Sequence, residues 1–128
     1  MKIIITERQR KLISEDEDRE FLVKKKIAKK QLTKKFGDLR PYETVGDSDI
    51  VLYIDEDKNV YFDYNKENGK SFVHYDIIWL FLEDIFSFNY KQIQQVTKEW
   101  LREHYKLGVK TTYGLNASAF AELREHYN

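Results

Sequence analysis

The sequence predicts an α+β fold, in which helices precede and follow a small antiparallel sheet. Two features of the 128 residues lead to this prediction: three β-rich runs in the middle of the chain, and helical spacing of apolar residues on either side of them. The expected order is an N-terminal strand and basic helix, a three-stranded antiparallel meander, and then three C-terminal helices. We expect a single domain over residues 1–128, because two cores in so short a chain would each bury too little surface.

The first part of the chain predicts a short strand and a long helix. Residues 2–5 are a β-branched run typical of a strand. Ser14 is followed by four acidic residues, which favours a helix start because serine caps the first backbone N–H groups and acids suit that end of the helix dipole. The helix is expected over residues 15–36, with Gly37 as its stop. Its apolar side carries Phe21, Ala28, Leu32 and Phe36.

Turn-forming residues divide the middle of the chain. Residues 40–49 contain Pro41, the only proline, and we expect a connection there. Three β-rich runs follow at residues 50–54, 59–64 and 71–75. The segments between these runs contain Asp, Asn and Gly, which favour tight turns. This pattern predicts the antiparallel meander.

A buried helix is expected after the meander. Asp76 is a suitable cap, and residues 77–88 are apolar nearly all round apart from two acids and a serine. We therefore expect this helix at the centre of the molecule, with Trp79 in the core.

Two further capping signals predict the last two helices. Asn89 and Gln92 form a capping pair for a clearly amphipathic helix that should end at Gly108, with Trp100 on its apolar side. After a loop, Asn116 is expected to cap the final helix.

Charge and aromatic residues are divided unevenly along the chain. The 22 basic and 22 acidic residues cancel overall, which disfavours a strongly basic nucleic-acid-binding protein at the level of the whole chain. Residues 1–40 nevertheless carry a net charge of +6, and residues 41–128 carry −6. Of the 19 aromatic residues, 17 lie in residues 41–128. The sequence thus predicts a basic helical segment, residues 1–40, and an acidic, aromatic-rich α+β core, residues 41–128.

The acidic turn of the meander partly resembles a calcium loop. Asp55, Asp57 and Asn59 have the spacing of positions 1, 3 and 5 of an EF-hand loop. Position 6 is Val60 instead of glycine, and position 12 is Lys66 instead of glutamate. We therefore expect a hairpin turn here, in which Asp and Asn bond their own backbone.

The sequence also lacks a complete nuclease or zinc-binding motif. Residues 56–58 have the acid-x-lysine spacing of a metal-dependent nuclease site, but the expected hairpin tip would not hold them rigidly. No pair among His74, His104 and His126 has the i, i+4 spacing of a zinc motif, and the chain has no cysteine. We expect no catalytic residue, no metal site, no cofactor and no enzyme activity.

A five-residue segment occurs twice near the C-terminus. Residues 101–105 and 123–127 both read LREHY. Two equivalent Glu-His pairs would form a metal or anion site if their helices lay side by side. A coincidence or a small duplication is the preferred interpretation, because one recurrence is not a repeat architecture.

A strip of lysines on the N-terminal helix is the candidate binding surface. Such a strip can dock on an acidic protein surface, or it can contact nucleic-acid phosphates without reading sequence. Arginine for bidentate base contacts is missing from it. The candidate residues are Lys24, Lys26, Lys29, Lys30, Lys34 and Lys35.

Nothing in the sequence indicates a membrane partner. The longest apolar run, residues 77–82, is far shorter than the ~20 residues needed to span a bilayer. The first ten residues mix acids and bases, unlike the apolar core of a signal peptide. We expect a soluble protein with a cytoplasmic location.

The opening residues 1–9, MKIIITERQ, resemble the starts of many small proteins of tailed bacteriophages, including crAss-like phages. The resemblance covers about a tenth of the chain and carries no functional residue with it. It implies a phage-encoded accessory or virion component, located in the host cytoplasm or in the particle.

These observations lead to three functional hypotheses. The first is a non-enzymatic protein-interaction or structural protein, whose basic helix docks on an acidic surface of itself, of a copy or of another protein. The alternative is a nucleic-acid-binding module that uses the lysine strip. A metal-dependent hydrolase comes third.

Overall fold

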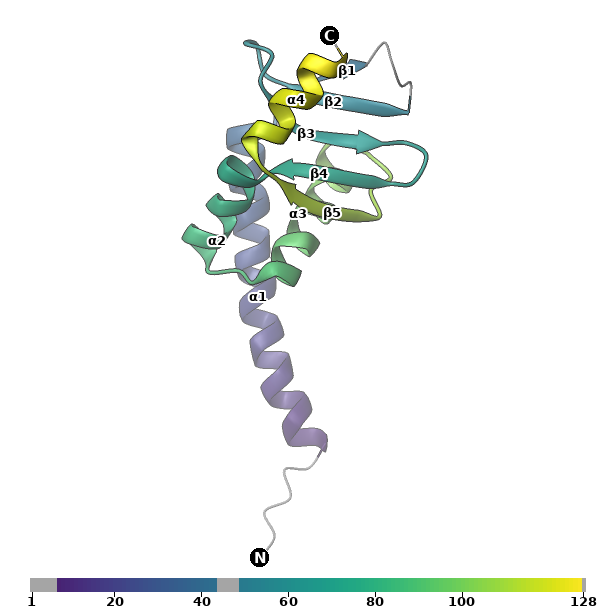
Figure 1. The fold of residues 1–128 in the computed structure, drawn as a ribbon. Helices are drawn as coiled ribbons and strands as arrows, with labels where there is room; N and C mark the ends of the chain where they lie inside the picture. The colour runs from purple at the N-terminus through teal and green to yellow at the C-terminus, as the bar shows by residue number, and fades with distance from the viewer. Residues whose placement is uncertain (1–6, 44–48, 128) are drawn as a thin grey trace, which may run out of the picture.

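The computed structural model describes residues 7–43 and 49–127, with side chains at residues 19–42 and 49–122. These residues form an α+β fold with a mixed sheet of five strands and four α-helices (Figure 1). The strands are β1 (Arg40–Glu43), β2 (Ile50–Ile54), β3 (Val60–Asn65), β4 (Lys70–His74) and β5 (Thr111–Leu115). The helices are α1 (Glu7–Phe36), α2 (Leu80–Phe86), α3 (Tyr90–His104) and α4 (Ala117–Tyr127), with a π-helix, η1 (Tyr75–Trp79), leading into α2.

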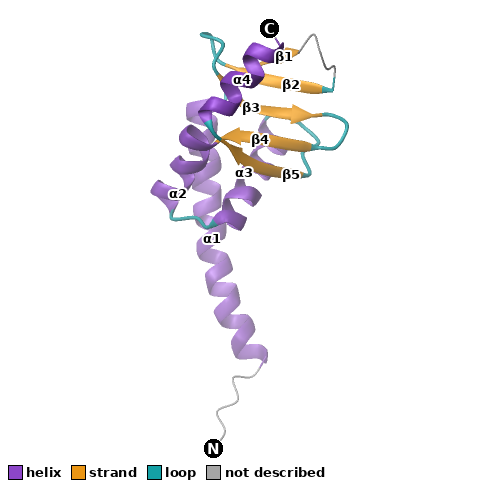
Figure 2. Ribbon diagram, in the orientation of Figure 1, coloured by secondary structure: helices purple, strands orange, loops and turns teal. Residues whose placement is uncertain are grey.

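The sheet follows the order of the chain, β1-β2-β3-β4-β5 (Figure 2). The first four strands pair antiparallel, whereas β5 pairs parallel to β4. A parallel neighbour cannot be reached by a tight turn, and the chain uses η1, α2 and α3 as the crossover. This crossover places α3 beside the edge strand β5.

Helices cover both faces of the sheet and divide the core in two. α1, α2 and α3 lie on one face, while α4 crosses the other (Figure 1). The larger core joins Leu32 of α1 and Trp100 of α3 to Phe62 of β3. The smaller core joins Phe120 of α4 to Leu52 of β2. Neighbouring residues of one strand point to opposite faces, which is why β2 contributes to both cores.

The α+β class is confirmed. The three predicted β-rich runs correspond to β2, β3 and β4, which pair antiparallel, but they are part of a mixed sheet with two more strands. β1 was expected to be a connection because it contains Pro41. Proline lacks a backbone N–H, and an edge strand such as β1 tolerates that loss. β5 was expected to be a loop, and its partner β4 lies about forty residues earlier in the sequence, beyond the reach of a local pattern.

The N-terminal helix is longer than predicted. α1 begins at Glu7 instead of residue 15 and passes through Ser14, because the residues before Ser14 are mostly strong helix formers. Figure 1 shows its first turns extending away from the sheet and the other helices. The strand predicted at residues 2–5 lies outside the described residues.

The expected central helix is instead a flanking one. His74, not Asp76, caps η1, through its Nδ1 atom, which accepts a hydrogen bond from the Ile77 N–H at 3.2 Å. Trp79 is buried as predicted, but Ile85 is 64% exposed. The segment therefore buries one side only, although its composition is apolar nearly all round.

The caps of α3 and α4 are confirmed. Asn89 and Gln92 form the predicted capping box, with bonds of 2.9 and 3.0 Å, and Asn116 accepts from the Ala119 N–H at 2.9 Å. The end of α3 was predicted wrongly at Gly108. The helix stops at His104, and Lys106 takes the left-handed conformation (φ 58°) that the glycine was expected to provide.

A carboxylate is buried on the α4 face of the sheet. Asp63 of β3 pairs in register with Leu52 of the smaller core and is 6% exposed. Its Oδ1 accepts a hydrogen bond from the Phe72 N–H at 2.8 Å. Burial raises the pKa of Asp63, the bond from Phe72 opposes this, and the pKa lies at about 6. The folded protein thus binds this proton more tightly than the unfolded chain does.

We predict that Asp63→Asn stabilises the protein near neutral pH. The stability that the Asp63 proton contributes is fully present below its ordinary pKa of 3.8 and is lost as pH rises through about 6. Asparagine keeps the acceptor for the Phe72 N–H without the charge. The free energy of unfolding of the variant should therefore exceed that of the parent by up to about 3 kcal/mol near pH 8. Near pH 3.5 this gain should vanish.

Urea unfolding at both pH values measures the difference. Asp84→Asn, at an exposed position on α2, is the control and should change stability by less than about 0.5 kcal/mol. An Asp63→Asn variant that is no more stable than the parent near pH 8 would contradict the buried-charge interpretation.

Candidate functional site

α1 and α3 run side by side and are joined by an ion-pair cluster. Lys25 Nζ lies 3.1 Å from Glu99 Oε1, and Lys29 Nζ lies 3.0 Å from both Glu99 Oε1 and Glu103 Oε2. The two lysines are 13% and 18% exposed, so this cluster is partly screened from water. The basic helix therefore docks on the acidic residues of α3 in its own chain.

The pKa values follow from this cluster. Partial burial alone would raise the pKa of Glu99, but hydrogen bonds from Lys29, Lys25 and Gln95 outweigh it and lower the pKa to about 2. Burial opposes the charged form of Lys29, whereas its bonds to Glu99 and Glu103 raise the pKa. Both groups therefore stay ionised at neutral pH, and the glutamates are neutralised locally.

The contact between α1 and α3, which we call the seam, begins with these ion pairs and continues toward the sheet with hydrogen bonds between uncharged groups. Trp100 Nε1 donates to Thr33 Oγ1 at 3.0 Å, and the Tyr105 hydroxyl donates to the Phe36 carbonyl. The same hydroxyl accepts from the Leu39 N–H at 3.1 Å. Burial raises the pKa of Tyr105 to about 12, so the hydroxyl keeps the proton that it donates. The C-terminal end of α1 is thus fixed to α3.

The structure divides the predicted lysine strip into three groups. Lys29 lies in the seam with α3. Lys24 pairs with Glu20 at 3.3 Å, and the Lys35 ammonium lies 5.3 Å from the centre of the Phe81 ring, on the side of α2. The remaining lysines follow one another at i, i+4 spacing and are exposed on the outer side of α1: Lys26, Lys30 and Lys34.

α3 adds cations that the sequence interpretation missed. Lys91, Lys98 and Arg102 recur at i, i+7 and i+11 on the polar side of this helix, a spacing that was readable from the sequence. With Lys110, the first two line a groove of about 280 Å³ between α3 and β5. Polar side chains complete its lining: Gln94, Gln95, Glu99, Thr111 and Thr112.

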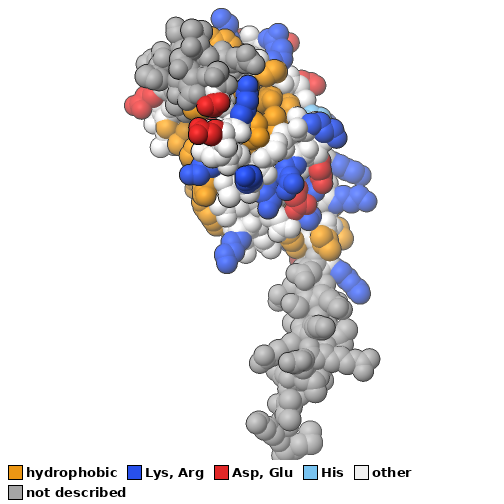
Figure 3. All heavy atoms as spheres, turned by 90° about the vertical axis from the view of Figure 1, so that its right-hand side faces the viewer, with side chains coloured by type: hydrophobic (Ala, Val, Ile, Leu, Met, Phe, Trp, Pro, Cys, Tyr) orange, Lys and Arg blue, Asp and Glu red, His pale blue; other side chains and the backbone are white. Residues whose placement is uncertain are grey.

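These cations and those of α1 form one surface, which we call the basic face. It consists of Lys26, Lys30, Lys91, Lys98, Arg102 and Lys110. Glu99 joins its two parts, because it lines the groove and also binds both seam lysines. Figure 3 shows Lys and Arg side chains gathered on this side of the molecule around a small group of acidic side chains. Folding thus gathers positive charge on one surface, although the net charge of the whole chain is zero.

In the acidic turn between β2 and β3, both carboxylate oxygens of Asp55 accept hydrogen bonds from neighbouring residues. Asp55 Oδ1 accepts from the N–H groups of Asp57 and Asn59, both at 2.9 Å, and its Oδ2 accepts from the Tyr61 hydroxyl at 3.0 Å. This is the predicted turn. Among the described residues, no group of three or more acidic or histidine side chains is placed to hold a metal ion.

A second groove, of about 380 Å³, lies between the sheet and α4. His74 lines it, stacked on Phe120 with ring centres 5.7 Å apart. Burial lowers the pKa of His74, against a smaller opposite effect of Asp76. Since Nδ1 caps η1, the histidine has a structural role.

Of the two LREHY segments, the structure describes the side chains of the first only, residues 101–105. In the first copy, Leu101 is buried and Tyr105 closes the seam, while His104 Nε2 lies 2.9 Å from the Gly37 carbonyl oxygen. The side chains of residues 123–127 lie outside the described ones, so the suggested Glu-His site is not placed.

Comparisons of this chain with family models, with curated proteins and with solved structures find no match. Within the described part of the chain, no helix has both the length and the apolar composition to cross a membrane.

Proposed function

We propose that this protein is a non-enzymatic nucleic-acid-binding protein that uses the basic face. The observation that carries the proposal is the arrangement of α1, α3 and the start of β5, which brings six exposed or half-exposed cations to one surface, five from the two helices and Lys110 from the residue before β5. The nearest acids, Glu99 and Glu103, are already neutralised by Lys25 and Lys29. A polyanion approaching this side therefore meets positive charge.

The zero net charge of the chain is compatible with this function. Other acidic side chains lie outside the basic face, on α2 at Asp84 and in the turn at residues 55–57, while Glu83 of α2 lines a neighbouring groove beside Tyr90. Each phosphate neutralised by a lysine or arginine releases a counterion, so binding depends on the local face more than on the total charge. With one arginine among its six cations, the face is suited to backbone contacts rather than to base readout.

The proposal predicts binding that weakens steeply with salt. A fluorescence-anisotropy titration of a labelled oligonucleotide should show the logarithm of the association constant falling linearly with the logarithm of salt concentration. Lys30→Ala/Arg102→Ala, which removes one cation from each helix, should reduce that slope by about 2. Lys24→Ala/Lys35→Ala removes the same charge from the side facing α2 and should leave the slope nearly unchanged.

Two results would contradict the proposal. One is the absence of binding at low salt. The other is an equal loss in both double variants, since this would mean that only the net charge of the molecule matters.

A protein partner is the second candidate function. α1 exposes apolar side chains beyond the seam: Leu22 is 52%, Val23 60% and Ile27 47% exposed. Val23 and Ile27 are one helical turn apart and form a continuous apolar strip. This observation supports the hypothesis of an interaction or virion component, as the bacteriophage resemblance of the opening residues implies.

Self-association is the form of this candidate that is simplest to test. If the basic and acidic parts of different copies attract each other, light scattering should show an oligomer at low salt that dissociates near 1 M salt, where the Debye length is ~3 Å. If the apolar strip holds the copies together, the oligomer should persist at high salt and be lost in Val23→Ser/Ile27→Ser. A monomer under all conditions would exclude self-association through either surface.

A further inference from the structure

We propose that the rim between α3 and β5 binds single-stranded nucleic acid. Bases stack on exposed tyrosines at one end of this rim, and lysines at the other end contact the phosphates. This inference rests on the proposed function and assigns it a substrate class. The rim residues are Tyr75, Trp79, Tyr90, Lys91, Lys98 and Lys110.

The rim is continuous because α3 runs antiparallel to β5. At one end, Tyr90 and Gly114 line the same groove of about 350 Å³. In the middle, Gln94 Nε2 donates to the Thr112 carbonyl at 3.0 Å. At the other end, Lys98 and Lys110 line the groove of about 280 Å³. The two grooves therefore follow one another along α3. β5 contributes Gly114 to the first groove and Thr111 and Thr112 to the second, and η1 and α2 complete the first.

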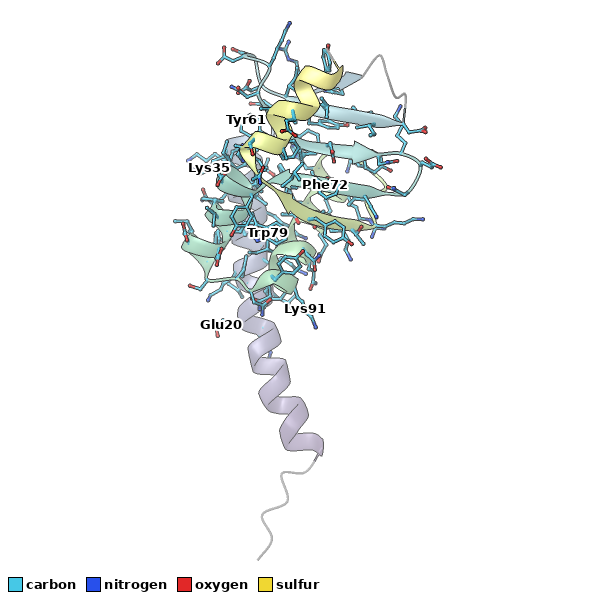
Figure 4. The ribbon with its side chains drawn as sticks, viewed as in Figure 1. Glu20, Lys35, Tyr61, Phe72, Trp79 and Lys91 are labelled. Atoms are coloured by element: carbon cyan, nitrogen blue, oxygen red, sulfur yellow. The ribbon has the colours of Figure 1, made fainter. Side chains whose placement is uncertain are left out.

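Three aromatic rings build the first end. The ring centres of Trp79 and Tyr90 are 5.0 Å apart, and those of Tyr75 and Trp79 are 6.5 Å apart with nearly parallel planes. Trp79 is 3% exposed, whereas Tyr75 is 39% and Tyr90 55% exposed. The two tyrosine rings thus pack on the buried indole of Trp79 and remain partly exposed to solvent. Figure 4 shows Trp79 near the β5 side of the sheet and Lys91 on the first turn of α3.

Gly114 allows the aromatic side chains to lie against β5. A Cβ atom at this position would come 2.9 Å from Tyr75 Cδ2 and 3.3 Å from the Trp79 indole. Glu83 also lines this groove, and its carboxylate can accept hydrogen bonds from the amino groups of bases.

The lysines continue from this aromatic end along α3. Tyr90 and Lys91 are adjacent, and Lys98 follows after about 12 Å of helix axis. That length corresponds to roughly three or four stacked nucleotides. A strand lying along the rim would therefore have bases at the tyrosines and phosphates within reach of Lys98 and Lys110.

The chemistry of the rim favours a single strand over its competitors. In a duplex, the faces of the bases are covered by their neighbours, so exposed tyrosines add nothing to binding. Unpaired bases stack on aromatic side chains, while lysines follow the backbone, which is the usual combination in single-strand binding. An extended peptide would need the free edge of β5, but the Gln94 amide already occupies the Thr112 carbonyl there.

Anisotropy titrations of the full chain test the proposal with three probes. These are a labelled oligothymidine of roughly ten nucleotides, a hairpin duplex of similar charge and a polyglutamate peptide. The oligothymidine should bind more tightly than the duplex. Tyr90→Ala should weaken its binding by about 5- to 150-fold, the loss expected for one stacked base, and leave the duplex unaffected.

Two further variants complete the design. Tyr90→Phe should keep the parent affinity, because stacking needs the ring and not the hydroxyl. Ile85→Ala removes another large exposed side chain, 64% exposed on α2, and should change nothing. Thermal unfolding of each variant shows that it is folded.

Each unexpected outcome has a separate meaning. Equal binding of single strand and duplex, with no effect of Tyr90→Ala, would overturn the inference on the rim and leave the basic face as a general polyanion surface. Binding of neither nucleic acid would overturn the proposed function as well. Polyglutamate that binds as tightly as oligothymidine, with the same loss in Tyr90→Ala, would identify the rim as a protein site and overturn the inference.

Discussion

The docking of α1 on α3 is the interaction on which the rest of the structure depends. It closes the larger core by placing Ala28 and Leu32, both fully buried, over the sheet. It also places the outer lysines of α1 beside the cations of α3, so the basic face exists only when the two helices are together. The seam therefore connects the stability of the fold with its proposed function.

Apolar burial and neutral hydrogen bonds contribute more to this docking than the ion pairs do. A fully buried leucine contributes about 1.5–3 kcal/mol, and each hydrogen bond of Trp100 or Tyr105 about 1 kcal/mol. Ion pairs near the surface contribute about 0–1 kcal/mol each. The main effect of Lys25 and Lys29 is on the charge of the surface, because they cancel Glu99 and Glu103 and leave the surrounding cations unopposed.

Local signals in the sequence predicted the local structure. The Asn89–Gln92 capping box, the Asn116 cap and the turn at Asp55 all depend on residues a few positions apart, and all three are present. The strand β5 was missed because its pairing with β4 is parallel and distant in sequence. Only part of the basic face was predicted. The spacing of the lysines on α1 could be recognised in the sequence. Their position beside the cations of α3 depends on how the two helices pack, and residue spacing within one helix does not predict that.

The arrangement of α1 and α3 in solution can be measured directly, because the chain has no cysteine and labelling sites can be introduced freely. Spin labels on cysteines at Lys30 and Arg102, both exposed, would report the distance between the helices by double electron–electron resonance. Packed helices have axes about 8–10 Å apart, so we expect one narrow, short distance distribution that persists at ~1 M salt, since apolar burial is the main term. A broad distribution reaching much longer distances, or one that broadens when salt is added, would contradict this account of how the basic face is assembled.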